Sequence, residues 1–324
     1  MSIREMTATR AREIVKRQTP PRWGPRYIPG QQAIRGEKSG QSKASTIPSA
    51  LLQRDVHAIA GTEKPYLALA LYHPKLFELK EQHALSLKPG DHPLVGHPKA
   101  RGLILPTTTG TAAVAERLGL GKRHPRARED FGPGAKTPFR YIAAPMLRDL
   151  LLFLEDEAGP YCVDWDVKDK VGDHGMPGPG PWAKRTAPRA IENSRSIDAI
   201  YVEYMKELGI RVVRVAKEQL DPVFTTNLLR LLKFHSQTSE TAPHIQAELL
   251  DAYCEALKTG RPANLVINDF VRAGVEPDEC RKVLFEGIWY RKVRIDLFSG
   301  WMIDHPMIPE RRDPLVVYGH LFTR

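Results

Sequence analysis

Two mainly apolar segments joined by a short polar turn form the clearest pattern along the chain. Residues 146–155 and 161–168 each suit a β-strand, and the polar run 156–159 between them suits a turn. Together they predict a β-hairpin. In the register that this turn sets, Asp149 lies opposite, or nearly opposite, Asp166.

Side chains of the second segment divide between two faces, because successive residues of a strand point to opposite sides. One face carries Asp164, Asp166 and Lys168, and the other carries Val163, Trp165 and Val167. Trp165 is therefore expected to pack on the core side, and Asp164 to be a supporting or edge carboxylate. Two acids that face each other across a hairpin repel, so a cation or a raised pKa must relieve the pair.

The segments around the hairpin predict an α/β domain. Apolar residues at three- and four-residue steps predict one or two helices from Leu51 to the His73-Pro74 pair, and Glu63 lies in this helical stretch. Further elements are expected as a strand over 77–87, a helix over 111–118, a Gly- and Pro-rich loop over 172–188, a helix over 197–208 and a strand over 210–215. The order helix, strand, hairpin, helix, strand favours a mixed β-sheet flanked by helices.

Beyond Pro222 the periodicity becomes helical, over 224–234, 247–257, 263–271 and 277–289, and 291–297 is expected to be a strand. Helices followed by a β segment are compatible with a winged-helix-like module that docks partners and DNA. A helical partner-docking domain without DNA contact is equally compatible. The predicted division is therefore an arm over 1–48, a first domain over 49–220 and a second domain over 221–324.

Charge adds a preference for a polyanionic partner. The chain has 48 Lys and Arg against 38 Asp and Glu, a net charge of +10. The residues up to 43 hold ten basic and three acidic side chains, with arginines and aromatics interleaved in the stretch 20–27. This composition predicts a basic, flexible arm, which either follows DNA phosphates or is an inert tail.

Cysteine usage and hydropathy exclude other classes. Three cysteines without CxxC spacing support neither a disulfide framework nor a cysteine zinc site. No apolar stretch reaches the length that crosses a membrane, so a cytoplasmic protein without a membrane partner is expected. The run Leu118-Gly-Leu-Gly-Lys122 lacks the spacing of a phosphate-binding loop, so a nucleotide site is not expected.

The facing acids suit metal-dependent phosphodiester hydrolysis. Mg²⁺ binds through one or two carboxylates and keeps several waters, so two or three acids suffice. Lys168 could orient or deprotonate the attacking water, and a helix-borne acid, for which Glu63 is the candidate, would complete the site. Acid-x-Lys occurs often by chance, so exposed strand charges are the safer explanation of the motif when it is taken alone.

Several segments occur in one order along the chain. They are Gly61–Pro74 with its helical acid, Phe77–Leu85, Thr111–Gly119 with His124-Pro125, Arg148-Asp149-Leu150, Trp165–Lys168, and Tyr204–Leu220. In this order they resemble TnsA, the endonuclease subunit of heteromeric cut-and-paste transposons. The resemblance covers roughly residues 50 to 300.

The resemblance implies a restriction-endonuclease-like core that cuts the 5′ ends of a transposon in double-stranded DNA. Glu63, Asp149 and Asp166 would bind Mg²⁺, with Mn²⁺ as a substitute, and Lys168 would be the catalytic lysine. A TnsB-like transposase subunit would cut and join the 3′ ends, and a TnsC-like ATP-dependent regulator would dock on the C-terminal domain. The protein would act in the bacterial cytoplasm on DNA.

Two alternatives stay open from the sequence. A stand-alone restriction or resolvase-type nuclease would have the same core and would cut DNA without partners. A non-catalytic DNA-binding adaptor would retain the fold without the chemistry.

Overall fold

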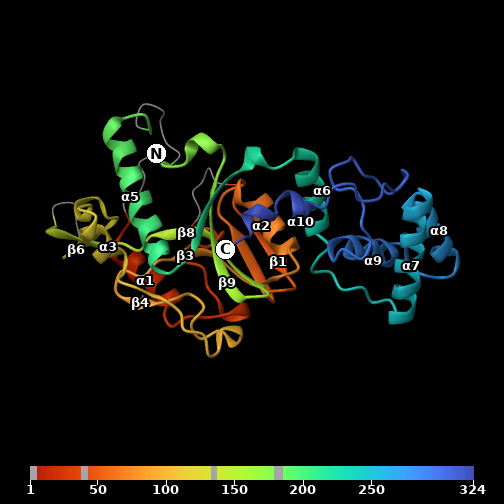
Figure 1. Cartoon of the computed structure of the whole chain (residues 1–324), viewed down its shortest axis with the longest axis horizontal. Coiled ribbons are helices and arrows are strands. Elements are labelled where there is room, and N and C mark those ends of the chain that lie inside the picture. The colour runs from red at the N-terminus through yellow and green to blue at the C-terminus, as the bar shows by residue number, and fades with distance from the viewer. Residues whose placement is uncertain (1–5, 38–42, 133–136, 179–184) are drawn as a thin grey trace.

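A four-stranded mixed sheet forms the centre of the molecule (Figure 1). The structure is a computed structural model, which describes residues 6–37, 43–132, 137–178 and 185–324. Its strands are β1 (Ser45–Ser49), β2 (Arg54–Ala58), β3 (Leu76–Ala84), β4 (Gly90–Asp91), β5 (Thr107–Thr108), β6 (Arg126–Asp130), β7 (Phe139–Ala143), β8 (Leu147–Asp156), β9 (Gly159–Lys168) and β10 (Arg211–Ala216). Its α-helices are α1 (Ala8–Gln18), α2 (Glu63–Tyr72), α3 (Thr111–Arg117), α5 (Pro188–Glu207), α6 (Pro222–Leu232), α7 (Pro243–Thr259), α8 (Ala263–Arg272), α9 (Pro277–Trp289) and α10 (Pro314–Val317). None of these helices is long and apolar enough to cross a membrane.

The central sheet has the strand order β10-β9-β8-β3. Strand β8 is antiparallel to both β3 and β9, whereas β10 is parallel to β9. A parallel neighbour requires a crossover, and α5 supplies it between β9 and β10. The predicted order of helix, strand, hairpin, helix and strand, and with it a mixed α/β sheet, is confirmed.

Helices cover both faces of this sheet. Leu150, Leu152 and Trp165 pack in one hydrophobic core with α2, where the ring centroids of Tyr66 and Trp165 are 5.6 Å apart. Leu151, Phe153 and Cys162 point to the opposite face and pack with side chains of α5 such as Tyr201 and Tyr204. The predicted alternation of β9 is thus confirmed, with Trp165 fully buried on the core side.

Residues 45–58 form a β-hairpin, so the helix expected from Leu51 onward is wrong there. Strands β1 and β2 pair antiparallel, and the turn between them contains Gln53 with a φ of 52°. Arg54 of β2 reaches across to β3, where its Nη1 and Nη2 lie 2.7 and 2.8 Å from the Glu81 carboxylate. This buried ion pair fixes β2 beside β3, and sequence periodicity cannot detect such a long-range pair. The predicted helix is correct only over α2.

The N-terminal region is folded onto the sheet instead of extending as the predicted flexible arm. Helix α1 buries Ala8, Ala11 and Ile14, and Arg10 and Arg17 of this helix form ion pairs with Glu37. Farther along, Trp23 packs edge-on against Phe153, and the Lys80 ammonium lies 3.6 Å from the Trp23 ring centroid. The arginines and aromatics of this stretch therefore serve the fold. Residues 1–5 and 38–42 of the predicted arm lie outside the described residues.

The predicted Gly- and Pro-rich loop falls between the end of β9 and the start of α5, where Val171–Asp173 form a short 3-10 helix. Residues 179–184 of this loop lie outside the described residues. Helix α5 begins at Pro188, earlier than the periodicity indicates, because the fixed φ of proline suits the first helical position.

The C-terminal region is helical, as predicted for its four helices, but the strand expected over 291–297 does not form. Ile295 makes only an isolated bridge to Pro309, so the described residues beyond 221 contain no wing. The last residues return to the central sheet, where Trp165 Nε1 donates to the Leu321 carbonyl at 2.9 Å. The rings of Trp165 and Phe322 are 5.0 Å apart. The extreme C-terminus therefore helps to cover the α2 face.

Substituting Trp23 tests whether the N-terminal region is part of the fold. Trp23→Ala removes the ring that contacts Phe153 and Lys80, and we expect it to lower the free energy of unfolding by about 2–3 kcal/mol in urea denaturation. The matched control is Phe131→Ala, because the Phe131 side chain is 59% exposed, and its effect should stay within about 0.5 kcal/mol. Equal effects of both substitutions would contradict the packing of this region on the sheet.

Candidate active site

Asp149, Asp166 and Lys168 come together at one end of the β8–β9 hairpin. The backbone pairing of the two strands ends at Leu150 opposite Trp165, one pair short of Asp149 and Asp166. Beyond this pair a side chain links the two strands, because Asp149 Oδ2 accepts the Val167 N–H at 2.8 Å. The prediction that the two acids lie opposite or nearly opposite each other agrees with this register.

Asp149 also has no backbone partner on β3, the strand on the other side of β8. Strand β3 pairs with β8 through Glu81 and His83 but not through Gln82, which has a φ of 49°. A non-glycine residue in this region stores strain, and such strain concentrates at functional sites. The Gly30 N–H donates to the Gln82 carbonyl at 3.0 Å and helps to hold this conformation. Asp149 therefore occupies a local break in the sheet.

Lys168 bridges the two aspartates. Its Nζ lies 2.7 Å from Asp166 Oδ1 and 3.5 Å from Asp149 Oδ2. Burial opposes the charge of the ammonium, but the two carboxylates together raise the pKa of Lys168 above its ordinary value. Lys168 is thus a charged hydrogen-bond donor at neutral pH. In this state it can orient a water or contact a phosphate oxygen, but it cannot remove a proton.

Asp166 is held by three cationic or donor side chains. Besides Lys168, Arg148 Nη2 lies 3.4 Å from Asp166 Oδ1, and His174 Nδ1 lies 2.8 Å from Asp166 Oδ2. Burial disfavours the carboxylate, yet the His174 hydrogen bond and the charges of Arg148 and Lys168 hold the pKa of Asp166 well below its usual range. An ionised carboxylate accepts hydrogen bonds, so His174 Nδ1 is the protonated nitrogen.

Asp164 forms a second buried ion pair behind the first. Arg148 donates to Asp164 Oδ2 through Nε at 3.2 Å and through Nη2 at 3.1 Å. The Arg148 guanidinium also lies 3.3 Å from the ring centroid of Tyr201 on α5. Burial raises the pKa of Asp164 to about 6 despite Arg148. Asp164 therefore supports the site from the core, and it is not the strand-edge carboxylate that the sequence also allowed.

Glu63, the helix-borne acid of the prediction, begins α2 and is buried. Its Oε2 accepts the Ile59 N–H at 2.7 Å. Burial, followed by the charge of Asp149, raises the pKa of Glu63 to about 8, whereas the charge of Lys168 lowers it. Glu63 thus interacts electrostatically with the aspartate–lysine group and carries a proton at neutral pH.

The donor chemistry of this cluster fits Mg²⁺. Four carboxylates, Glu63, Asp149, Asp164 and Asp166, accompany two permanent cations, Arg148 and Lys168, which leaves two uncompensated negative charges when all the acids are ionised. Oxygen donors with this charge excess suit a hard divalent ion. Within the described residues, however, no three His, Cys, Asp or Glu side chains are already arranged to hold a metal.

Sequence reasoning missed Arg148 and His174. Arg148 directly precedes Asp149 in the sequence, and this adjacency is the only signal in the sequence for its role. The alternation of apolar and polar residues along the strand does not indicate that role. His174 lies six residues after Lys168 in an irregular segment, where no periodicity indicates its contact with Asp166. Its Nε2 is buried and has no hydrogen-bond partner in the part of the chain that the structure describes.

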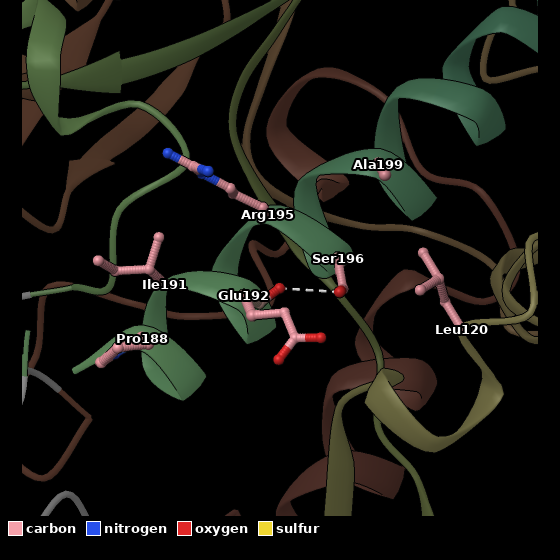
Figure 2. A pocket seen from close by; sticks show the side chains of 7 residues that line it. All are labelled: Leu120, Pro188, Ile191, Glu192, Arg195, Ser196 and Ala199. Atoms are coloured by element: carbon pink, nitrogen blue, oxygen red, sulfur yellow. Dashed lines mark hydrogen bonds between the residues drawn. The ribbon is translucent and has the colours of Figure 1, made fainter. Parts of the chain in front are cut away.

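A surface pocket beside the first turns of α5 is separate from this cluster (Figure 2). Leu120, Ile191 and Arg195 line it, and the Ser196 hydroxyl donates to the Glu192 carbonyl at 2.8 Å within the helix. Glu192 also pairs with Arg123 at 3.0 Å. The Ser196 hydroxyl and the Glu192 carboxylate of this pocket thus already have partners, and the candidate chemistry lies in the aspartate–lysine cluster.

The buried acid Glu63 predicts a pH-dependent stability. Because its pKa rises from 4.5 to about 8 on folding, the folded protein keeps a proton that the unfolded chain loses, so stability falls as pH rises through this window. Glu63→Gln should remove this loss and stabilise the metal-free protein by on the order of 3 kcal/mol at pH 9, with little effect at pH 4. Urea unfolding in EDTA measures both values.

The control for this experiment is Glu157→Gln, at the exposed turn of the β8–β9 hairpin. This substitution should leave the pH profile of stability unchanged. A Glu63→Gln profile that parallels the wild type from pH 4 to pH 9 would show that Glu63 is not a buried, protonated acid.

Comparisons with known proteins do not indicate a function for the cluster. No protein-family model matches the chain, and no curated protein matches it. The function of the chain is therefore inferred from the geometry of Asp149, Asp166 and Lys168 and from the ordered motifs of the sequence.

Proposed function

We propose that this chain is a Mg²⁺-dependent DNA endonuclease that cuts the 5′ ends of a transposon as one subunit of a heteromeric transposase. The observation that carries the proposal is the convergence of Asp149, Asp166 and Lys168, with the lysine Nζ 3.5 and 2.7 Å from the two carboxylates. Two carboxylates that can bind a metal ion, next to a positively charged lysine, suit phosphodiester hydrolysis. That reaction needs neutralisation of the phosphate charge and an oriented water.

The architecture supports a restriction-endonuclease-like core. The mixed sheet has α2 on one face and α5 on the other. Asp166 and Lys168 of β9 lie next to β8, the neighbouring strand that carries Asp149. The resemblance to TnsA anticipates the same order of helix, strand, hairpin, helix and strand. An arrangement of this kind leaves the end of the hairpin accessible to a DNA backbone, since Lys168 is 32% exposed.

In the proposed reaction the acids hold the metal, and the basic residues organise the acids. Asp149 and Asp166 would bind Mg²⁺, Mn²⁺ could substitute for it, and Glu63 would join them after losing its proton. When bound, Mg²⁺ would lower the pKa of a coordinated water and neutralise phosphate oxygens. Lys168, which is charged, would hold a water or a non-bridging phosphate oxygen by donation from Nζ.

Arg148 and His174 would act as positioning residues. His174 fixes Asp166 Oδ2 through its Nδ1, which leaves Oδ1 directed to Lys168. Arg148 neutralises Asp164 and contributes to the low pKa of Asp166, so that Asp166 remains an ionised ligand. Neither side chain needs to touch DNA for this role.

The proposed partners follow from the resemblance. A TnsB-like subunit would process the 3′ ends, and a TnsC-like regulator would dock on the helices α6 to α9. Helices α7 to α9 lie at one end of the long axis of the molecule, away from β6 at the other end, and α6 lies between them and the central part (Figure 1). A regulator bound there would leave the candidate active site open to DNA.

A cleavage assay with strand-labelled duplex DNA tests the chemistry. In the complex assembled with the transposase and regulator of the same element, Lys168→Ala should lower the rate of 5′-end cleavage about 100-fold or more, because it removes a charge next to the phosphate. The matched control is Lys170→Ala, two residues farther along the chain and exposed, and it should cleave at the wild-type rate.

Three results would contradict the proposal in different ways. Unchanged 5′-end cleavage by Lys168→Ala would remove this lysine from the chemistry. Sequence-specific cutting by the purified chain without partners would identify a stand-alone nuclease. DNA binding without Mg²⁺- or Mn²⁺-dependent cleavage in any assembly would identify a non-catalytic adaptor.

A further inference from the structure

A pocket in the C-terminal region lies between α6 and the loop of residues 300–305. It encloses about 570 Å³. Its helical side consists mainly of residues on one face of α6, from Val223 to Arg230, and its other side consists of Gly300–Met302 and His305. Among the described residues that line it, none is an aspartate or a glutamate. The pocket therefore presents hydrogen-bond donors and apolar groups without an acid of its own.

Hydrogen bonds from α6 hold the loop side of the pocket in place. Asn227 Nδ2 donates to the carbonyls of Leu297 and Ser299, each at 2.9 Å. Arg230 Nη1 donates to the Trp301 carbonyl at 3.0 Å. Because these bonds join helix side chains to the loop backbone, the two walls of the pocket are fixed relative to each other.

The charge of Arg230 is not compensated by an acid in the part of the chain that the structure describes. Besides its bond to the Trp301 carbonyl, its guanidinium lies 5.0 Å from the Trp301 ring centroid. Two other arginines of the C-terminal region, Arg291 and Arg294, lie 2.6 and 2.9 Å from the Asp313 carboxylate. A guanidinium has five N–H donors, so Arg230 retains donors for an anion in the pocket.

Trp301 supplies a second free donor. The residue is 6% exposed, and its Nε1 is buried without a hydrogen-bond partner among the described residues. Buried donors are nearly always paired, so an unpaired indole N–H indicates a missing acceptor. His305 is not free in this sense, because its Nδ1 lies 2.9 Å from Asp304 Oδ1. A carboxylate has two acceptor oxygens, one for Arg230 and one for Trp301.

The rim of the pocket is apolar and open to solvent. Val223 and Met302 line it and are 38% and 55% exposed. Methionine adapts its shape to different apolar partners. Sites for small molecules bury most of the ligand, whereas this rim leaves its apolar side chains exposed. The arrangement therefore suits a segment of a larger partner that covers the rim.

From these contacts we propose that the pocket beside α6 binds an acidic peptide segment of a partner protein. The ligand carboxylate accepts hydrogen bonds from Arg230 and from Trp301 Nε1, and a neighbouring apolar side chain of the ligand packs on Val223 and Met302. The net charge of +10 attracts an acidic partner at longer range. The proposal goes beyond the proposed nuclease function and does not require it, because the pocket contains no residue of the aspartate–lysine cluster.

The test is a selection of short random peptides on the full-length protein, followed by fluorescence polarisation with the tightest peptide. We expect the selected peptides to carry Asp or Glu next to a large apolar residue. Arg230→Gln should weaken binding of this peptide about 10-fold or more, because the bound carboxylate loses its cation. Changing the acid of the peptide to its amide should weaken binding to the wild type by about the same factor.

Met302→Asp provides a second variant whose folding is not in question, because Met302 is exposed. The new carboxylate repels the ligand, so binding should again weaken about 10-fold or more. The matched control is Arg272→Gln, at an exposed arginine of α8, which should bind like the wild type. Arg230→Gln is compared only if it keeps the thermal unfolding midpoint of the wild type, and otherwise Met302→Asp decides.

Three results would overturn the inference. The first is a selection that enriches no peptides, or peptides without acids. The second is wild-type affinity in the pocket variants. The third is displacement of the peptide by succinate at a similar concentration, which would identify a site for free small acids. Because no cleavage is measured, these results are independent of whether Lys168 acts in a nuclease.

Discussion

The charge balance around Asp166 is the constraint on which the central structure depends. Four carboxylates gather at one end of the β8–β9 hairpin, and Glu63, Asp164 and Asp166 are buried. Burying ionised carboxylates without partners would be unfavourable by several kcal/mol per ion. Arg148, Lys168 and His174 make the arrangement stable by contacting Asp164 and Asp166 directly. The Arg148 guanidinium also stacks on the ring of Tyr201 in α5. The packing of this helix therefore depends on the same arginine that neutralises the carboxylates.

Backbone geometry and charge act together at Asp149. The sheet is regular through Leu150 and Trp165, and it opens where the Asp149 side chain, instead of the backbone, accepts the Val167 N–H. Gln82 adopts its unusual φ at the same level of the neighbouring strand. The folded N-terminal region supports this opening through Gly30 and Trp23, and the C-terminus supports the other face through its contact with Trp165. Both chain ends thus stabilise the same hairpin.

The sequence allowed prediction of those parts of the fold that depend on local patterns. The β8–β9 hairpin, strand β3, helix α5 and the alternation that buries Trp165 all follow from periodicity and turn residues. The β1–β2 hairpin was mistaken for a helix because Leu52 and Val56 are spaced like a helical stripe, whereas the buried Arg54–Glu81 pair that fixes this hairpin links distant residues.

Long-range contacts likewise explain what was missed at the site and in the N-terminal region. The basic composition of the residues up to 43 predicts a flexible arm over 1–48, but in the described part of this region Glu37 pairs with Arg10 and Arg17 and compensates their charge. His174 reaches Asp166 from an irregular segment without periodicity. The roles of Glu63, Asp149, Asp166 and Lys168 as a metal and catalytic set remain a prediction that the geometry supports.

Metal binding tests the central claim most directly. Isothermal titration of Mg²⁺, and of Mn²⁺ in parallel, into the purified full-length protein should reveal a site that is lost in Asp149→Asn, because this change removes a ligand charge and retains the side-chain shape. Asp169→Asn, an exposed aspartate next to Lys168, is the matched control and should bind like the wild type. Equal binding by all three proteins, or no binding by the wild type in the presence of duplex DNA, would contradict a metal-dependent nuclease centre at this hairpin.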